Sequence, residues 1–172
     1  MVYTGRGDEG ETDLGSGESI EKDSGRIEAY GTVDELNSLV GLIASKNPGK
    51  LEEFEQIQNE LHVLQAELAN RNSEHRITAE DVERLEERCD AYQEDLPPLR
   101  DFVLAGGTEV ASLLHMARSV TRRAERRIVA LKDERYVRPE VLTYINRLSD
   151  LFFLMARDEN HESGVEEKNP DY

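Results

Sequence analysis

The chain has 172 residues, with 37 acidic side chains against 21 basic ones and a formal net charge of −16. That length fits one domain with a real core, and no run approaches the roughly 20 apolar residues of a membrane span. A surface this acidic argues against nucleic acid as a partner, because phosphate backbones require broad basic surfaces. It is also typical of proteins from a high-salt cytoplasm, which predicts a halophilic habitat.

The cysteine content and the N-terminus bear on the compartment. The single cysteine, Cys89, allows no internal disulfide, which fits a reducing compartment. The first residues contain no apolar core of a signal peptide. We therefore expect a cytoplasmic protein with no membrane partner. Cys89 shares a helical face with apolar residues, which predicts a small buried side chain and no catalytic thiol.

The first 31 residues form a glycine-rich segment. They hold seven of the twelve glycines and few large apolar residues. This composition predicts an irregular structure, either a disordered arm or a loop shaped around a ligand. Glycine lets the backbone approach a phosphate chain closely, so the second alternative would place backbone N–H groups on an anion.

Three amphipathic helices are predicted after this segment. The pattern at 32–35 resembles a capping box and predicts that the first helix begins at Thr32; Asn-Pro-Gly at 47–49 ends it. Apolar residues three and four apart predict the second helix at 51–70. A cap at Thr78 begins the third, which continues to about residue 96.

Two prolines at 97 and 98 open a linker that ends in a glycine pair at 106 and 107. A fourth helix covers about 108–131, and a fifth begins at Pro139. Five helices without convincing strand alternation predict an all-α protein, a five-helix up-and-down bundle. We expect a single domain at 1–172, with the glycine-rich segment at 1–31, the bundle at 32–160 and a loose polar tail at 161–172.

The fourth helix concentrates positive charge in an acidic chain. Its five arginines lie within ten residues: Arg118, Arg122, Arg123, Arg126 and Arg127. Three of them, Arg118, Arg122 and Arg126, follow a four-residue spacing and share one face. Like charges at this spacing repel unless an anion lies between them, and the guanidinium fork suits phosphate. The pattern favours a polyphosphate site.

Less specific interpretations of the same arginines remain open. The face could be solvated, Glu125 could pair with Arg122, or Arg118 could bind a carboxylate of a neighbouring helix or subunit. A polar patch in the fifth helix, Asn146, Ser149 and Asp150, has two interpretations as well. It is either a hydrogen-bond network between helices or a surface that faces a ligand or Mg²⁺.

Known metal and nucleotide motifs do not explain these residues. A ferritin-like metal centre needs Glu-x-x-His, and none of the four histidines has a glutamate three positions before it. The chain also contains no P-loop sequence, so a phosphate site here is of another kind.

Four segments together resemble the PduO-type ATP:cob(I)alamin (corrinoid) adenosyltransferase family. They are Tyr-Thr-x-x-Gly-Asp-x-Gly-x-Thr at 3–12, the run at 22–36, Asp-Phe-Val-Leu-x-Gly-Gly at 101–107, and the arginine run at 122–127 with Asn-Arg-Leu-Ser-Asp at 146–150. They span nearly the whole chain in the order of the family, and jointly they are highly specific.

The resemblance implies a homotrimer of five-helix bundles with active sites between subunits. The implied reaction transfers the 5′-deoxyadenosyl group of ATP to the cobalt of a reduced corrinoid, cob(I)alamin, and releases triphosphate. Co(I) is itself a strong nucleophile, so the reaction needs no general base, and the chain offers no catalytic triad. The departing triphosphate needs dense positive charge and Mg²⁺.

The resemblance also assigns site residues. ATP would be bound by Thr4, Gly5, Arg6, Gly7, Thr12, Lys22, Arg122, Glu125 and Arg126, while Asn146 would contact the phosphates or their Mg²⁺. Arg118 and Asp34 match the ion pair between subunits that borders the site. Arg122, Arg118, Asp34 and Phe102 are the catalytic set.

Phe102, with Val103 and Leu104, matches the corrinoid site of the family. Its ring would exclude the lower axial ligand, which makes Co(II) four-coordinate and easier to reduce. Without the motif, Phe102 would be interpreted as a plain core aromatic. A corrinoid reductase and an adenosylcobalamin-dependent mutase are the implied partners.

Two departures from the family affect loop geometry. Gly5 stands where the family has Lys or Arg, with Arg6 adjacent, and Ala105 replaces the proline before the glycine pair. Two competing classes are a non-enzymatic helical subunit that binds ATP and hands on corrinoid, and a helical scaffold with a solvated basic helix.

Overall fold

The computed structural model describes residues 5, 7–15, 17–70, 72–133 and 136–171. It contains five α-helices: α1 (Gly25–Lys46), α2 (Leu51–Ala69), α3 (Ala79–Asp95), α4 (Glu109–Ala130) and α5 (Pro139–Glu162). Short 3₁₀ turns cover Pro48–Lys50 and Leu131–Asp133. The predicted five-helix bundle is confirmed.

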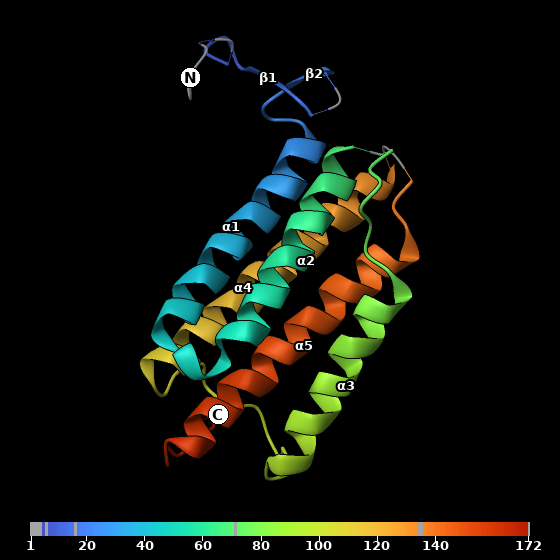
Figure 1. Cartoon of the computed structure of the whole chain (residues 1–172). Coiled ribbons are helices and arrows are strands. Elements are labelled where there is room, and N and C mark those ends of the chain that lie inside the picture. Colours follow the sequence, from blue (N-terminus) through green and yellow to red (C-terminus); the bar gives the residue numbers. More distant parts are fainter. Residues whose placement is uncertain (1–4, 6, 16, 71, 134–135, 172) are drawn as a thin grey trace.

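The helices alternate in direction along one bundle (Figure 1). The arginine helix α4 packs against both α1 and α5, while α2 packs on α1 and α3 on α5. The buried face of α4 consists mainly of small and aliphatic side chains, among them Ala117, Val120, Ala124 and Ile128. Small residues let the neighbouring helices approach closely, so α4 is held on two sides and its polar face is left outward.

The first helix begins earlier than predicted. Its N-cap is Ser24, whose hydroxyl accepts from the N–H of Ile27 at 3.4 Å, so α1 starts at Gly25 and not at Thr32. Thr32 lies buried inside the helix and donates its hydroxyl to the carbonyl of Glu28 at 2.6 Å. A threonine can satisfy its hydroxyl this way within a helix, which explains why it is no cap here.

The glycine-rich segment also contains a short hairpin that was not predicted. Strands β1 (Glu11–Asp13) and β2 (Ser19–Glu21) pair antiparallel, with Thr12 opposite Ile20. The hairpin projects beyond the end of the bundle at which α1 begins (Figure 1). Strands of three residues are too short for an alternating pattern to reveal them.

The C-terminal tail, predicted to be loose, contacts the linker before α4. The N–H of Leu104 donates to the carbonyl of Lys168 at 2.7 Å, and the side-chain amide of Asn169 donates to the carbonyl of Phe102 at 2.7 Å. Arg157, buried on α5, pairs with Glu167 at 3.0 Å. The prediction was wrong because the contacts between tail and linker join segments that lie far apart in the sequence, which a local pattern does not reveal.

The remaining helix starts agree with the sequence. Thr78 and Asp81 form a reciprocal capping box at α3, Thr108 caps α4, and Pro139 occupies the first turn of α5. Within the described ranges, no helix combines the length and apolarity that crossing a membrane requires.

Candidate functional site

The five arginines of α4 divide into two groups. Arg123 pairs with Glu35 of α1, and the Nη2 atom of Arg127 lies 3.5 Å from Glu28 Oε2. Arg118, Arg122 and Arg126 occupy another face, and no carboxylate in the part of the chain that the structure describes pairs with them. Two of the five charges are therefore neutralised within the chain, and a row of three remains available to an external anion.

The polar residues beside this row connect α4 to α5. The side-chain amide of Asn146 donates to Glu125 Oε1 at 3.1 Å. Glu125 therefore bonds to Asn146, and its predicted alternative partner Arg122 is left exposed. Asp150 Oδ2 lies 3.3 Å from Nη1 of Arg147, which is three residues earlier on α5. The polar patch therefore contains a hydrogen bond between helices, as expected for its interpretation as an interhelical network. Asn146 is half-buried and lies beside the arginine row.

The linker between α3 and α4 presents apolar side chains to solvent. Phe102 is 74% exposed and Leu104 is 52% exposed, while Val103 is half-buried. The alternative that Phe102 is a core aromatic is therefore wrong. An exposed phenylalanine forgoes about 2 kcal/mol of burial, and together with Leu104 it offers an apolar surface to a ligand.

The backbone of this linker is nevertheless fixed. The N–H of Phe102 donates to Asp101 Oδ1 at 2.7 Å, and its carbonyl accepts from Asn169. The tail holds Leu104 as well, through the carbonyl of Lys168. The aromatic ring is thus exposed while its own backbone is hydrogen-bonded on both sides.

The described part of the N-terminal segment brings two predicted ATP-binding residues together. The ammonium of Lys22 donates to the carbonyl of Gly7, and Thr12 lies in β1. Gly5 has a φ of 73°, a left-handed conformation that glycine adopts without strain, which fits its departure from the basic residue of the family. Thr4 and Arg6 lie outside the described residues.

Other predicted site residues are not brought together within one chain. Asp34 is exposed on α1, and no ion pair of the described chain joins it to Arg118. The guanidinium of Arg118 instead lies over the ring of Phe153, 5.7 Å from its centroid. The N-terminal hairpin and the Phe102 linker lie at opposite ends of the bundle (Figure 1). The predicted site residues of a single chain are therefore spread along the bundle.

Cys89, which could in principle act as a nucleophile, is buried in the core. Burial raises the pKa of the Cys89 thiol to about 11, so it is protonated at neutral pH, as predicted for a core residue. Among the described histidine, cysteine and acidic residues, no group of three could hold a metal ion.

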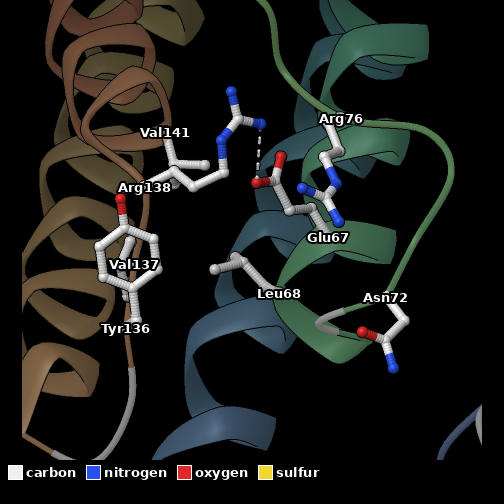
Figure 2. Close-up of a pocket in the computed structure, with 8 residues that line it drawn as sticks. All are labelled: Glu67, Leu68, Asn72, Arg76, Tyr136, Val137, Arg138 and Val141. Atoms are coloured by element: carbon white, nitrogen blue, oxygen red, sulfur yellow. Dashed lines mark hydrogen bonds and ion pairs between the residues drawn. The ribbon is translucent and has the colours of Figure 1, made fainter.

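The cavity between α2 and the start of α5 contains none of the predicted site residues (Figure 2). Its volume is about 230 Å³. Arg138 crosses it to Glu67 Oε1 at 3.2 Å, and Glu67 also accepts from the N–H of Ile77 at 3.0 Å. The buried carboxylate is thus used to hold the α2–α3 connection.

Comparison with known proteins places these features in a family. The family model described as cobalamin adenosyltransferase matches residues 2–159. A corrinoid adenosyltransferase of Bacillus subtilis (strain 168) is 45% identical, over 95% of this chain and 89% of the relative. The chain belongs to the cobalamin adenosyltransferase family. The predicted resemblance is confirmed.

Solved members of the family have the same fold. A variant of a PduO-type ATP:corrinoid adenosyltransferase from Lactobacillus reuteri, complexed with cobalamin and ATP, superposes with a TM-score of 0.93 at 37% identity, over 99% of this chain and 96% of that one. A second variant, complexed with ATP, gives 0.91 at 38% identity, over 99% of this chain and all of that one. A corrinoid adenosyltransferase PduO of Citrobacter freundii is 43% identical over 94% of this chain, which spans 50% of that relative's length.

Sequence reasoning missed two parts of this region. Asn160 is buried near the end of α5 and bonds to Gly106 and Thr108, on either side of Gly107 in the linker. The tail residues Lys168 and Asn169 bond to the same linker. Asn160 stands among charged residues at the end of α5, so no local signal marked it, and the tail gave none either.

Proposed function

We propose that this adenosyltransferase transfers the 5′-deoxyadenosyl group of ATP to the cobalt of a reduced corrinoid and releases triphosphate. The observation that carries the proposal is the row of Arg118, Arg122 and Arg126, which has no carboxylate partner in the described chain. A row of fixed guanidinium groups suits a polyanion, and triphosphate is the polyanion that this reaction produces.

In this reaction the electron pair of Co(I) attacks C5′ of ATP. The cobalt–carbon bond forms as the C5′–oxygen bond breaks, and the triphosphate departs with the bonding pair. Charge builds on the leaving oxygen, so Arg122 and Arg126 would act by stabilising it. No proton is transferred, which agrees with a site that contains no acid–base pair.

The residues beside the arginines would complete the ATP site. Glu125 and Asn146 are already bonded to each other, and Asn146 would contact the phosphates or their Mg²⁺. Oxygen donors of this kind fit Mg²⁺, which neutralises phosphate charge and is held largely by the nucleotide itself. Thr4, Gly5, Arg6, Gly7, Thr12 and Lys22 of the N-terminal segment would wrap the rest of ATP.

The Phe102 linker would form the corrinoid site. Phe102, Val103 and Leu104 present apolar surface on a fixed backbone. Placed below the corrin ring, Phe102 would exclude the lower axial ligand and leave Co(II) four-coordinate. Removing a donor to cobalt makes its reduction to Co(I) easier.

We place this site at the seam of a homotrimer. Asp34 is exposed and lacks an ion-pair partner in the described chain, so it would pair with Arg118 of a neighbouring subunit. An interface between unlike surfaces can close into a ring, and the family resemblance implies that this ring has three members. A corrinoid reductase and an adenosylcobalamin-dependent mutase are the proposed partners, in a reducing, cytoplasmic, high-salt compartment where Co(I) can persist.

The test is to mix the protein with reduced cobalamin, ATP and Mg²⁺ and to follow the spectrum of a light-sensitive alkylcobalamin. We expect Arg122→Ala to lower the rate by about 100-fold or more, because it removes a donor to the leaving group. Arg127→Ala is the matched control, since that arginine lies on the same helix but pairs with Glu28. It should retain most of the activity.

Two results would contradict the proposal. Near-normal turnover by Arg122→Ala, with the helix content unchanged, would remove this residue from the phosphate site. ATP and corrinoid binding by the unaltered protein without any alkylcobalamin would instead indicate a non-enzymatic carrier.

A further inference from the structure

The glycine pair before α4 is held by one buried side chain from α5. Asn160 is 2% exposed, although it is polar. Its Oδ1 atom accepts from the N–H of Thr108 at 3.0 Å, and its Nδ2 atom donates to the carbonyl of Gly106 at 3.0 Å. A single amide thus satisfies two backbone groups on either side of Gly107, and no apolar residue of similar size could do so.

Gly107 fits closely against this amide. Its φ is +112°, a conformation that favours glycine. A Cβ atom built at this position would lie 1.9 Å from Asn160 Oδ1, a separation that no pair of nonbonded heavy atoms tolerates. Glycine at 107 and asparagine at 160 therefore depend on each other.

The same amide lies where three parts of the site region meet. Thr108 is the N-cap of α4, and its hydroxyl accepts from the N–H of Ala111 at 3.0 Å. The backbone carbonyl of Asn160 accepts from Val165 at 2.8 Å, at the start of the tail that bonds to Phe102 and Leu104. Asn160 thus links the arginine helix, the linker and the tail.

We propose that Asn160 is a positioning residue, which holds the Gly106–Gly107 turn and thereby fixes the backbone that presents Phe102 to the corrinoid. The inference rests on the proposed function, because it assumes that Phe102 contacts the corrin ring. Asn160 itself touches no reacting atom. It acts at the end of the linker next to α4, while the tail bonds to the middle of the linker, at Phe102 and Leu104.

Loss of the amide should affect the cobalt and leave the nucleotide largely untouched. In Asn160→Ala the N–H of Thr108 and the carbonyl of Gly106 lose their partner, and the turn becomes free to move. With ATP bound, we expect the ratio of four-coordinate to five-coordinate cob(II)alamin to fall about tenfold, as measured by electron paramagnetic resonance. The Kd for ATP, measured by calorimetry, should change by less than about twofold.

The matched control is Asn37→Ala, which removes an amide that donates to the carbonyl of Gln58 at 3.2 Å between α1 and α2. It should lower thermal stability without changing the cobalt signal. A four-coordinate fraction in Asn160→Ala equal to that of the unaltered protein would overturn the inference. Parallel losses of ATP affinity and cobalt signal would also overturn it, since they indicate a general structural role.

A double-variant cycle tests the contact itself, and its Gly107→Ala arm remains informative if Asn160→Ala folds poorly. Gly107→Ala should reduce the four-coordinate fraction strongly, because its methyl group displaces the amide of Asn160. The same change should cost less in the Asn160→Ala background, where that space is empty; additive effects would contradict the coupling. If the unaltered protein itself gave no four-coordinate signal, the role of Phe102 would fail and not that of Asn160.

Discussion

Arginines on one helix have different roles because of the direction in which each points. Arg123 and Arg127 face α1 and meet glutamates, whereas Arg118, Arg122 and Arg126 lie one turn apart on another face. Repulsion along that row costs a few tenths of a kcal/mol per pair in the free protein. A bound polyanion would reverse the sign of this contribution.

Phe102 provides a prediction at the same scale. In Phe102→Ala the loss of the ring should slow adenosylation by about 30-fold or more, since burying a phenylalanine against a ligand contributes about 2 to 3 kcal/mol. The ATP affinity should change by less than about twofold, because Phe102 is not among the residues proposed to bind ATP. Cobalt spectroscopy and calorimetry on the same sample measure both.

Leu99→Ala is a suitable control for Phe102→Ala. Leu99 is an exposed apolar residue of the same linker, so this variant removes similar surface without the aromatic ring. A collapse of ATP affinity in Phe102→Ala, together with an unchanged cobalt spectrum, would show that the corrinoid assignment is wrong.

At the scale of elements, the contact between α4 and α5 contains a buried histidine. His115 of α4 packs against Phe153 of α5, with ring centroids 6.1 Å apart. Burial, aided by the charge of Arg118 and opposed by Glu167, lowers the pKa of His115 below its ordinary value of 6.5. The folded protein therefore keeps this imidazole neutral to a lower pH than the unfolded chain does.

The sign of the pH dependence follows from this shift. Below about pH 6.5 the unfolded chain binds a proton that the folded protein does not, so this contribution to stability is lost as the pH falls. We expect His115→Gln to take up fewer protons on unfolding below about pH 6.5 than the unaltered protein does, as measured by denaturant titrations at several pH values. An unchanged pH dependence would place the titration elsewhere.

The starts of the helices show which features of the fold the sequence could predict and which it could not. Thr78 and Asp81 cap α3 as their spacing indicated, because side chains alone make that motif. The similar pattern at Thr32 predicted the wrong helix start, because the helix is capped at Ser24 and begins seven residues before Thr32. Glycines at 25 and 31 disguised this start, although each costs a helix only about 1 kcal/mol.

The candidate site was predictable to the extent that side-chain identity carries it. The arginine row and the Phe102 motif were recognisable from spacing and family resemblance. That Glu125 bonds to Asn146, and that Asn160 holds a turn 53 residues earlier in the chain, depends on how α5 packs against α4 and the linker. Packing of distant segments leaves no local pattern to interpret.

At the scale of the whole molecule, the charge distribution and the incomplete site of one chain both support the proposed trimer. A chain with a net charge of −16 keeps three arginines on one helix that pair with no carboxylate among the described residues, and exposes Asp34 on another. The parts of the site in one subunit lie at opposite ends of the bundle (Figure 1). A ring of three subunits of 19.5 kDa would bring the parts of neighbouring subunits together.

The central claim is that the arginine row of one subunit binds the triphosphate of ATP at a seam to which the neighbour contributes Asp34. Asp34→Ala and Arg122→Ala should each inactivate the enzyme when expressed alone. The two variants are co-expressed with different affinity tags. Purification through both tags then retains only the mixed rings. In every mixed ring, one of the three seams receives both unaltered residues, so we predict about one third of the unaltered activity. Mixed trimers as inactive as either parent would contradict the account.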